Sequence, residues 1–141
     1  RAPMDIAFIE GYEPDEAFDL REFIFRYFSL NTIENIMLGK QFARIVHGGY
    51  AIPLVYAKGL RTAWYRIEKD MIVNEDPQDQ TNPFPTLVIA IKGTGHAQID
   101  GLTFSFSEGE AYYIPKNITH VFWTDSNEGL EFIIIMYGEG A

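Results

Sequence analysis

Residues 86–122 constrain the fold most, because short apolar runs and tight turns follow each other there without a gap. The segment reads TLVIAIKGTGHAQIDGLTFSFSEGEAYYIPKNITHVF. Short runs with alternating or aromatic character are typical of β-strands. The Gly-Thr-Gly, Asp-Gly and Ser-Glu-Gly-Glu sequences between them are turns, in which Gly and Asp supply the conformations that reverse the chain. The segment therefore predicts several short strands joined by tight turns.

The same pattern extends on both sides of this segment. Residues 74–85, NEDPQDQTNPFP, are acidic, polar and rich in Pro, which predicts a loop. Short strands at this spacing, with Gly turns between them, predict an all-β fold, a single antiparallel β-barrel or double-sheet roll. We expect its strands at residues 42–46, 52–56, 60–67, 87–91, 96–99, 102–106, 111–114, 120–123 and 130–137.

The N-terminal third differs in character from the rest. Residues 15–30, DEAFDLREFIFRYFSL, carry a wide apolar stripe with acids early and arginines late, which favours a helix. Asn31 and Glu34 are spaced as in a capping box, so a second short helix is expected at residues 32–38, ended by Gly39.

These patterns divide the chain into three parts. Residues 1–3 precede Met4 and are expected to be a cloning remnant. Residues 4–50 are expected to be a helical and strand segment that packs on the barrel or on a dimer partner, and residues 51–141 to be the barrel itself.

Charge and composition exclude several classes of protein. The net charge is −9, and no run of Lys and Arg is present, which argues against binding to nucleic acid or to an anionic membrane. The chain has no Cys, so disulfides, thiolate zinc sites and Cys nucleophiles are excluded. No apolar run reaches the length of a membrane helix, and no signal peptide is visible, so a cytoplasmic protein is expected.

A spaced set of residues begins after the sixth expected strand. Gly109, Pro115, Asn117, His120 and Thr124 stand at the spacing Gly, five residues, Pro, one residue, Gly, two residues, His, three residues, Asn. Three of these five positions match, and Asn117 tolerates the left-handed conformation of the Gly that it replaces. This pattern resembles the second motif of the cupins. The resemblance covers about residues 60–137 and implies a jelly-roll barrel. The expected fold is therefore this barrel together with the N-terminal helical segment predicted from residues 15–38.

The first cupin motif carries two His and one Glu, which together with the His of the second motif bind a metal. Anchored on Gly93, that motif falls here on Asn74, Gln80, Asn82 and Thr86. Neutral amides and hydroxyls are poor ligands for first-row transition metals. We therefore expect no metal and no cofactor. A rearranged metal site that uses Glu75, Asp76 and Asp79 of the loop remains the alternative.

Without a metal, the pocket that the resemblance implies would be a ring of neutral polar groups in an apolar cup. The predicted ring consists of Gln80, Asn82, Thr86 and His120, and it suits a small polar or ring-shaped organic molecule. A buried, hydrogen-bonded His120 without chemistry is the plainer alternative.

Alternation along the strands adds further candidates. Arg61 and Tyr65 share one strand face, and Phe122 and Thr124 share a face with His120, so these four are predicted ligand contacts. Tyr112 and Tyr113 point to opposite faces, and Tyr113 is the predicted catalytic partner of His120. His96 is expected to face away from the interior, and His47 lies in a turn, which argues against a three-histidine site.

Three functions remain open at this point. The first is a small-molecule-binding protein without the usual metal site. The second is a metal-independent isomerase, cyclase or lyase that uses His120 as acid or base. The third is a metal-dependent dioxygenase or lyase with rearranged ligands. The resemblance to small cupins also implies a homodimer.

Overall fold

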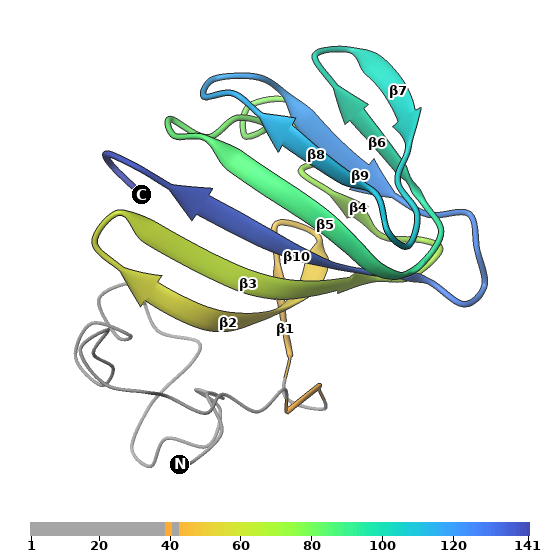
Figure 1. Cartoon of the computed structure of the whole chain (residues 1–141). Helices are drawn as coiled ribbons and strands as arrows, with labels where there is room; N and C mark the ends of the chain where they lie inside the picture. Colours follow the sequence, from red (N-terminus) through yellow and green to blue (C-terminus); the bar gives the residue numbers. More distant parts are fainter. Residues whose placement is uncertain (1–38, 41–42) are drawn as a thin grey trace.

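The structure is a computed structural model and describes residues 39–40 and 43–141 of the chain. Its described part is built from ten β-strands in two antiparallel sheets (Figure 1). The strands are β1 (Arg44–Val46), β2 (Gly49–Ala57), β3 (Leu60–Ile67), β4 (Ile72–Val73), β5 (Thr86–Gly93), β6 (His96–Ile99), β7 (Leu102–Ser105), β8 (Ala111–Ile114), β9 (His120–Trp123) and β10 (Leu130–Tyr137).

The larger sheet has the strand order β1-β2-β3-β10-β5-β8, and the smaller has the order β4-β9-β6-β7. The last strand, β10, pairs with β3 on one side and β5 on the other, so it joins the early and late parts of the chain. The two sheets face each other as a roll (Figure 1). The fold is therefore the antiparallel double-sheet roll that the sequence predicts.

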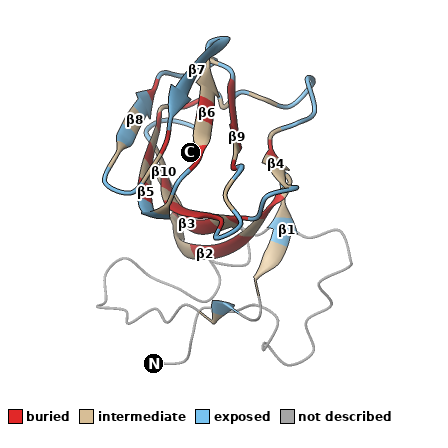
Figure 2. Ribbon diagram, turned by 90° about the vertical axis from the view of Figure 1, so that its right-hand side faces the viewer, coloured by how far each residue is buried: buried red, intermediate tan, exposed pale blue. Residues whose placement is uncertain are grey.

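The core lies between the sheets and combines aliphatic side chains with a cluster of aromatic rings. Phe106, Phe122 and Phe132 are fully buried, and their ring centroids lie 5.2–5.5 Å apart. Tyr65 of β3 stacks on Phe132 with centroids 5.3 Å apart. Figure 2 shows buried residues along the strands that enclose this core, whereas β7 is exposed along its whole length. Tilted aromatic pairs of this kind contribute about 0.5–1.5 kcal/mol each beyond the area they bury.

Most strand predictions are confirmed. The bounds at residues 60–67, 96–99, 111–114, 120–123 and 130–137 agree with β3, β6, β8, β9 and β10. The loop at residues 74–85 is confirmed as well, since it contains no strand or helix. The short strand β4 was not predicted, because two residues carry no periodicity.

The large sheet begins with β1 at Arg44, inside the range 4–50 that the sequence assigns to the N-terminal segment. The two predicted helices, residues 15–30 and 32–38, lie outside the described residues. Within the described part of the chain, no helix has the length and apolar character needed to cross a membrane.

Candidate functional site

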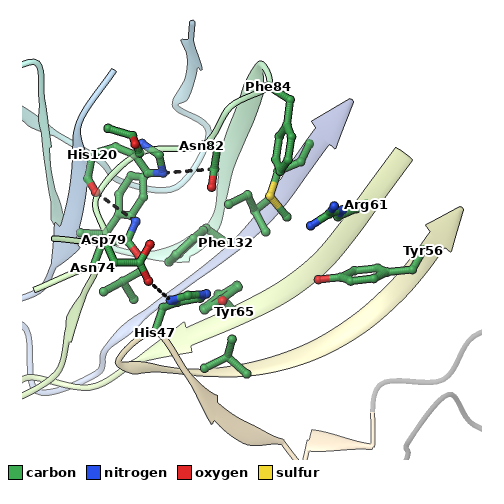
Figure 3. Close-up of a pocket in the computed structure, with 16 residues that line it drawn as sticks. His47, Tyr56, Arg61, Tyr65, Asn74, Asp79, Asn82, Phe84, His120 and Phe132 are labelled. Carbon is green, nitrogen blue, oxygen red and sulfur yellow. Dashed lines mark hydrogen bonds and ion pairs between the residues drawn. The ribbon is translucent and has the colours of Figure 1, made fainter. Parts of the chain in front are cut away.

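A pocket of about 140 Å³ opens between the sheets, beside the loop of residues 74–85 (Figure 3). Nine of its lining residues are aromatic or aliphatic and seven are polar or charged, so the walls mix apolar surface with many hydrogen-bonding groups. Concave sites that combine apolar walls with polar groups are typical of small-molecule binding. The lining residues are Val46, His47, Tyr56, Arg61, Tyr65, Val73, Asn74, Asp79, Thr81, Asn82, Phe84, His120, Phe122, Phe132, Ile134 and Met136.

The hydrogen bonds of His120 define which of its ring nitrogens carries the proton. It opens β9 and is 2% exposed. Its Nδ1 lies 3.0 Å from the carbonyl oxygen of Ile118, which can only accept a hydrogen bond, so Nδ1 carries the proton. In the neutral ring, Nε2 is then an acceptor, and it lies 3.4 Å from Nδ2 of Asn82. His120 therefore offers the pocket a basic lone pair.

The charge state of His120 follows from its surroundings. Burial lowers the pKa of His120 below 6.5, and this effect outweighs the hydrogen bond to Ile118 and the carboxylate of Asp79, both of which raise it. His47 lowers the pKa of His120 slightly further. The imidazole is therefore neutral at pH 7, which is the state that accepts a hydrogen bond or a proton through Nε2.

Asn82 is placed by backbone hydrogen bonds between the long loop and the segment before β9. The amide of Asn117 donates to the carbonyl of Asn82 at 2.7 Å, and the amide of His120 donates to the carbonyl of Gln80 at 2.9 Å. Asn117 has a φ of 63°, so it adopts the left-handed conformation that the motif position requires. These bonds hold the side chain of Asn82 between His120 and Thr86, whose Oγ1 accepts from Asn82 Nδ2 at 3.1 Å.

The mouth of the pocket contains a pair that sequence reasoning did not assign to the site. Nδ1 of His47 lies 3.2 Å from Oδ2 of Asp79 (Figure 3). The amide of Asn74 donates to the carbonyl of His47 at 2.9 Å, and Nδ2 of Asn74 donates to the carbonyl of His120 at 3.1 Å. The missed signal was His47-Gly48 itself, because both residues have positive φ and turn the chain back into β2 beside the loop.

The structure brings five of the predicted site residues to the pocket. Its lining includes Arg61, Tyr65, Asn82, His120 and Phe122.

The other four predicted site residues lie elsewhere. Gln80 turns its amide toward the loop backbone, where Nε2 donates to the carbonyl of Asn74 at 3.0 Å. Thr86 is 1% exposed and lies behind Asn82. Thr124 is fully buried and donates to the carbonyl of Thr94 at 2.6 Å. Tyr113 is 56% exposed, so it is not brought to His120.

The side chains around His120 do not fit a first-row transition metal. Its neighbour Asn82 is a neutral amide, and Gln80 points away. Of the three loop acids, Glu75 and Asp76 are exposed, and Asp79 pairs with His47. Among residues 39–40 and 43–141, no group of three His, Cys, Asp or Glu side chains is arranged to hold a metal ion. One imidazole with amide neighbours is a weak ligand set for such metals.

Comparison with known proteins agrees with this architecture. A family model described as the cupin domain matches residues 70–136. No curated protein sequence matches the chain.

Three similar solved structures carry the same fold. A cupin 2 conserved barrel domain protein from Salinispora arenicola CNS-205 has a TM-score of 0.66 and 17% identity, over 77% of this chain and 91% of that protein. KdgF from a Halomonas species has a TM-score of 0.63 and 13% identity, over 77% and 97%. An RmlC-like cupin from Shewanella frigidimarina has a TM-score of 0.59 and 15% identity, over 74% and 91%.

At these identities the solved structures show the fold alone. The family model matches residues 70–136, a range that includes both the long loop and His120. The match of the cupin domain model to residues 70–136, together with the double-sheet roll and the spacing of Gly109, Pro115 and His120, supports the cupin superfamily for this chain.

Proposed function

We propose that this protein binds a small polar organic molecule in the pocket beside His120, and that it does so without the usual cupin metal. The observation that carries the proposal is the neutral His120 ring, whose Nδ1 proton is held by Ile118 and whose Nε2 lone pair faces the pocket next to Asn82. Such a protein is a sensor or an accessory factor rather than a metalloenzyme.

The hydrogen bonding around Nε2 favours an incoming ligand. The contact between Asn82 Nδ2 and His120 Nε2 is 3.4 Å, which is long for a hydrogen bond. A ligand hydroxyl or N–H at a shorter distance would replace this weak contact with a stronger one. Asn82 would keep its other hydrogen bond, to Thr86 at 3.1 Å. Binding of the ligand would therefore break only one weak hydrogen bond.

The pocket walls favour a ring or a short branched carbon skeleton. Tyr65, Phe84, Phe122 and Phe132 all line the pocket. Flat aromatic walls bury apolar surface of a ring, while His120 and Asn82 fix its orientation.

A test of this proposal uses a set of small hydroxylated ring compounds, screened by ligand-observed NMR against the untagged protein. The variant His120→Gln keeps a polar side chain of similar size but lacks the basic nitrogen. We expect binding in the wild type and a loss of at least about tenfold in affinity in His120→Gln, the weight of one hydrogen bond to a buried group. The matched control is His96→Gln, since His96 is on β6 and is not among the residues that line the pocket. Equal binding by wild type and His120→Gln would refute the proposal.

A second candidate is a metal-independent isomerase, cyclase or lyase, in which His120 removes a proton from the bound molecule. The same neutral Nε2 lone pair favours it, because a general base must be unprotonated at the working pH. Tyr113 is too exposed to serve as its partner. Incorporation of deuterium from heavy water into a bound compound, lost in His120→Gln, would support this candidate. Binding of the compound without any deuterium incorporation would contradict this candidate and agree with a protein that only binds its ligand.

A further inference from the structure

A second imidazole, that of His47, borders the pocket on the same side as His120. His47 lies in the turn between β1 and β2, and its side chain is among those that line the pocket. Figure 3 shows both imidazoles at the end of the pocket away from Tyr56. Because both rings border one pocket of about 140 Å³, a single small molecule can touch both of them.

Asn74 fixes the spacing between the two histidines. Its backbone amide donates to the carbonyl of His47 at 2.9 Å, and its side-chain Nδ2 donates to the carbonyl of His120 at 3.1 Å. Asn74 directly follows β4, and β4 pairs with β9, the strand that His120 opens. The two imidazoles are therefore held on one backbone framework before any ligand arrives, which lowers the entropy cost of binding.

The backbone at His47 and Asn74 adopts a conformation that side chains rarely adopt. Among the described residues other than glycine, four have a positive φ, and two of them are His47 (52°) and Asn74 (63°). The left-handed conformation costs such residues roughly 1–2 kcal/mol, and strain of this kind gathers at functional sites. Gly48 continues the turn with a φ of +96°, and a Cβ there would overlap the carbonyl oxygen of Ile72. The turn is thus packed directly on β4 and sets the position of His47.

Asp79 decides which nitrogen of His47 carries the proton. Nδ1 of His47 lies 3.2 Å from Oδ2 of Asp79, and a carboxylate only accepts hydrogen bonds, so Nδ1 is the donor. In the neutral ring Nε2 is then an acceptor, and no described residue has a hydrogen bond to it. The carbonyl of Ile118 fixes the ring of His120 in the same tautomer. The pocket thus presents two Nε2 lone pairs to a ligand.

We propose that the ligand of this pocket carries two hydrogen-bond donors, such as two hydroxyls on one ring, of which one donates to Nε2 of His120 and the other to Nε2 of His47. This inference rests on the proposed function and adds the class of the ligand and a second residue that selects it. Asp79 is a positioning residue, because it acts through the tautomer of His47. A ligand with only acceptors at this end is disfavoured, because facing lone pairs leave both partners without a hydrogen bond.

The test uses catechol, resorcinol and hydroquinone, which cover the ways in which two hydroxyls can be placed on one benzene ring. Each is compared with its monomethyl ether, which has nearly the same shape but only one donor. The chain contains three His, so a nitrogen NMR spectrum of the imidazoles has only three rings to assign. The spectra are recorded at about pH 8, where imidazoles are ordinarily neutral. His96 is the internal control, because its Nε2 pairs with Asp125 at 3.0 Å and it is not among the residues that line the pocket.

In the free protein we expect Nδ1 to be protonated and Nε2 to be unprotonated in both His47 and His120. The dihydroxybenzene that binds most tightly should shift the Nε2 signals of both rings. Its monomethyl ether should shift that of His120 alone, because a buried acceptor is the more costly one to leave unpaired. The signals of His96 should stay in place with every probe.

Two variants measure the weight of the second hydrogen bond. His47→Asn removes the imidazole but keeps a residue that tolerates the left-handed conformation. We expect it to weaken binding of the dihydroxybenzene about fivefold, the weight of one neutral hydrogen bond, and to leave binding of the ether unchanged. His96→Asn, the matched control, should change neither affinity. Because the spectra use the wild type, the inference stays testable if His47→Asn fails to fold.

Three results would overturn the inference. A protonated Nε2 of His47 in the free protein would make this nitrogen a donor and reverse the chemistry that the ligand needs. Shifts of His120 alone with every probe, or equal losses of both affinities in His47→Asn, would remove His47 from ligand recognition and leave the proposed function standing. No His120-dependent binding of any probe would count against the proposed function, and this inference would fall with it.

Discussion

His47 Nδ1 lies 3.2 Å from Asp79 Oδ2, and this pair joins the turn before β2 to the long loop at the mouth of the pocket. Both side chains are more than half exposed, at 53% and 58%. Exposed pairs of this kind contribute at most about 1 kcal/mol to stability, because water screens them. The importance of the pair lies instead in the charges it places near His120.

The two members of this pair should shift the titration of His120 in opposite directions. Asp79 raises the pKa of His120 and His47 lowers it, although burial is the largest influence. We therefore expect Asp79→Asn to lower the pKa of His120 and His47→Gln to raise it. The measurement is an NMR pH titration of the His120 ring signals in each variant. Shifts of the same sign in both variants would contradict this arrangement of charges.

Acid should destabilise the protein through His120. Its folded pKa lies below 6.5, the value expected in the unfolded chain, because burial disfavours the charged ring. Between those two pKa values the unfolded chain binds more protons, so stability is full above about pH 6.5 and is lost as the pH falls toward the folded pKa. We expect urea midpoints to fall across this window in the wild type. His120→Gln should show a flatter profile, and an unchanged slope in that variant would assign the effect to other groups.

The sequence predicts this fold well because the strands carry alternation and the turns carry Gly and Asp. The positions of Asp100-Gly101 and Lys58-Gly59 fix the hairpins, and the adjoining strand bounds at residues 60–67 and 96–99 are confirmed. Asn117 also adopts the left-handed conformation expected of it, with a φ of 63°. Local chemistry therefore determines most of the secondary structure.

The pocket is less predictable because contacts between distant segments define it. Gln80 and Asn82 are neighbours in the loop, yet only Asn82 lines the pocket, since Gln80 donates to the loop backbone. No motif indicates that Tyr56, Phe84 and Met136 meet around Arg61. The strand register places Tyr56 and Met136 beside Arg61, and Phe84, which contacts Arg61, lies in an irregular loop. Side chains on a loop without periodicity cannot be oriented from sequence alone.

Gly93 should be intolerant of any side chain. Its φ is +86°, and a Cβ placed there would overlap the carbonyl oxygen of Gly129. We expect Gly93→Ala to lower the free energy of unfolding by more than about 3 kcal/mol, since strain and backbone overlap add together. The matched control is Gly101→Ala, where φ is +79° but no atom lies within 4 Å, so the cost should be about 1–2 kcal/mol. Urea denaturation of both variants measures the difference, and equal losses would show that conformation alone matters.

Glu131 should stabilise the outer face of the large sheet. Its side chain is 5% exposed, and its Oε1 accepts from Lys40 Nζ at 2.9 Å and from Trp64 Nε1 at 3.1 Å. Arg66 and Lys92 lie 3.9 and 4.0 Å from the other carboxylate oxygen. Burial raises the pKa of Glu131, but Lys40, Trp64 and Lys92 together outweigh it, so the pKa lies below 4.5. The carboxylate is therefore ionised at neutral pH.

Two substitutions separate the charge of Glu131 from its hydrogen bond to Trp64. Glu131→Gln keeps an acceptor for the indole but loses the charge, and we expect a loss of about 1 kcal/mol, because the three cations can return to water. Glu131→Leu also leaves the buried indole N–H without its acceptor, which should cost about 1–3 kcal/mol more. The loss in Glu131→Gln should fade as the pH falls through the folded pKa, because the wild-type carboxylate then becomes neutral as well. Urea unfolding at a series of falling pH values, with the protonation of the Glu131 carboxyl followed by NMR, measures both effects, and a loss in Glu131→Gln that persists after the wild-type carboxyl is protonated would show that the charge is not its cause.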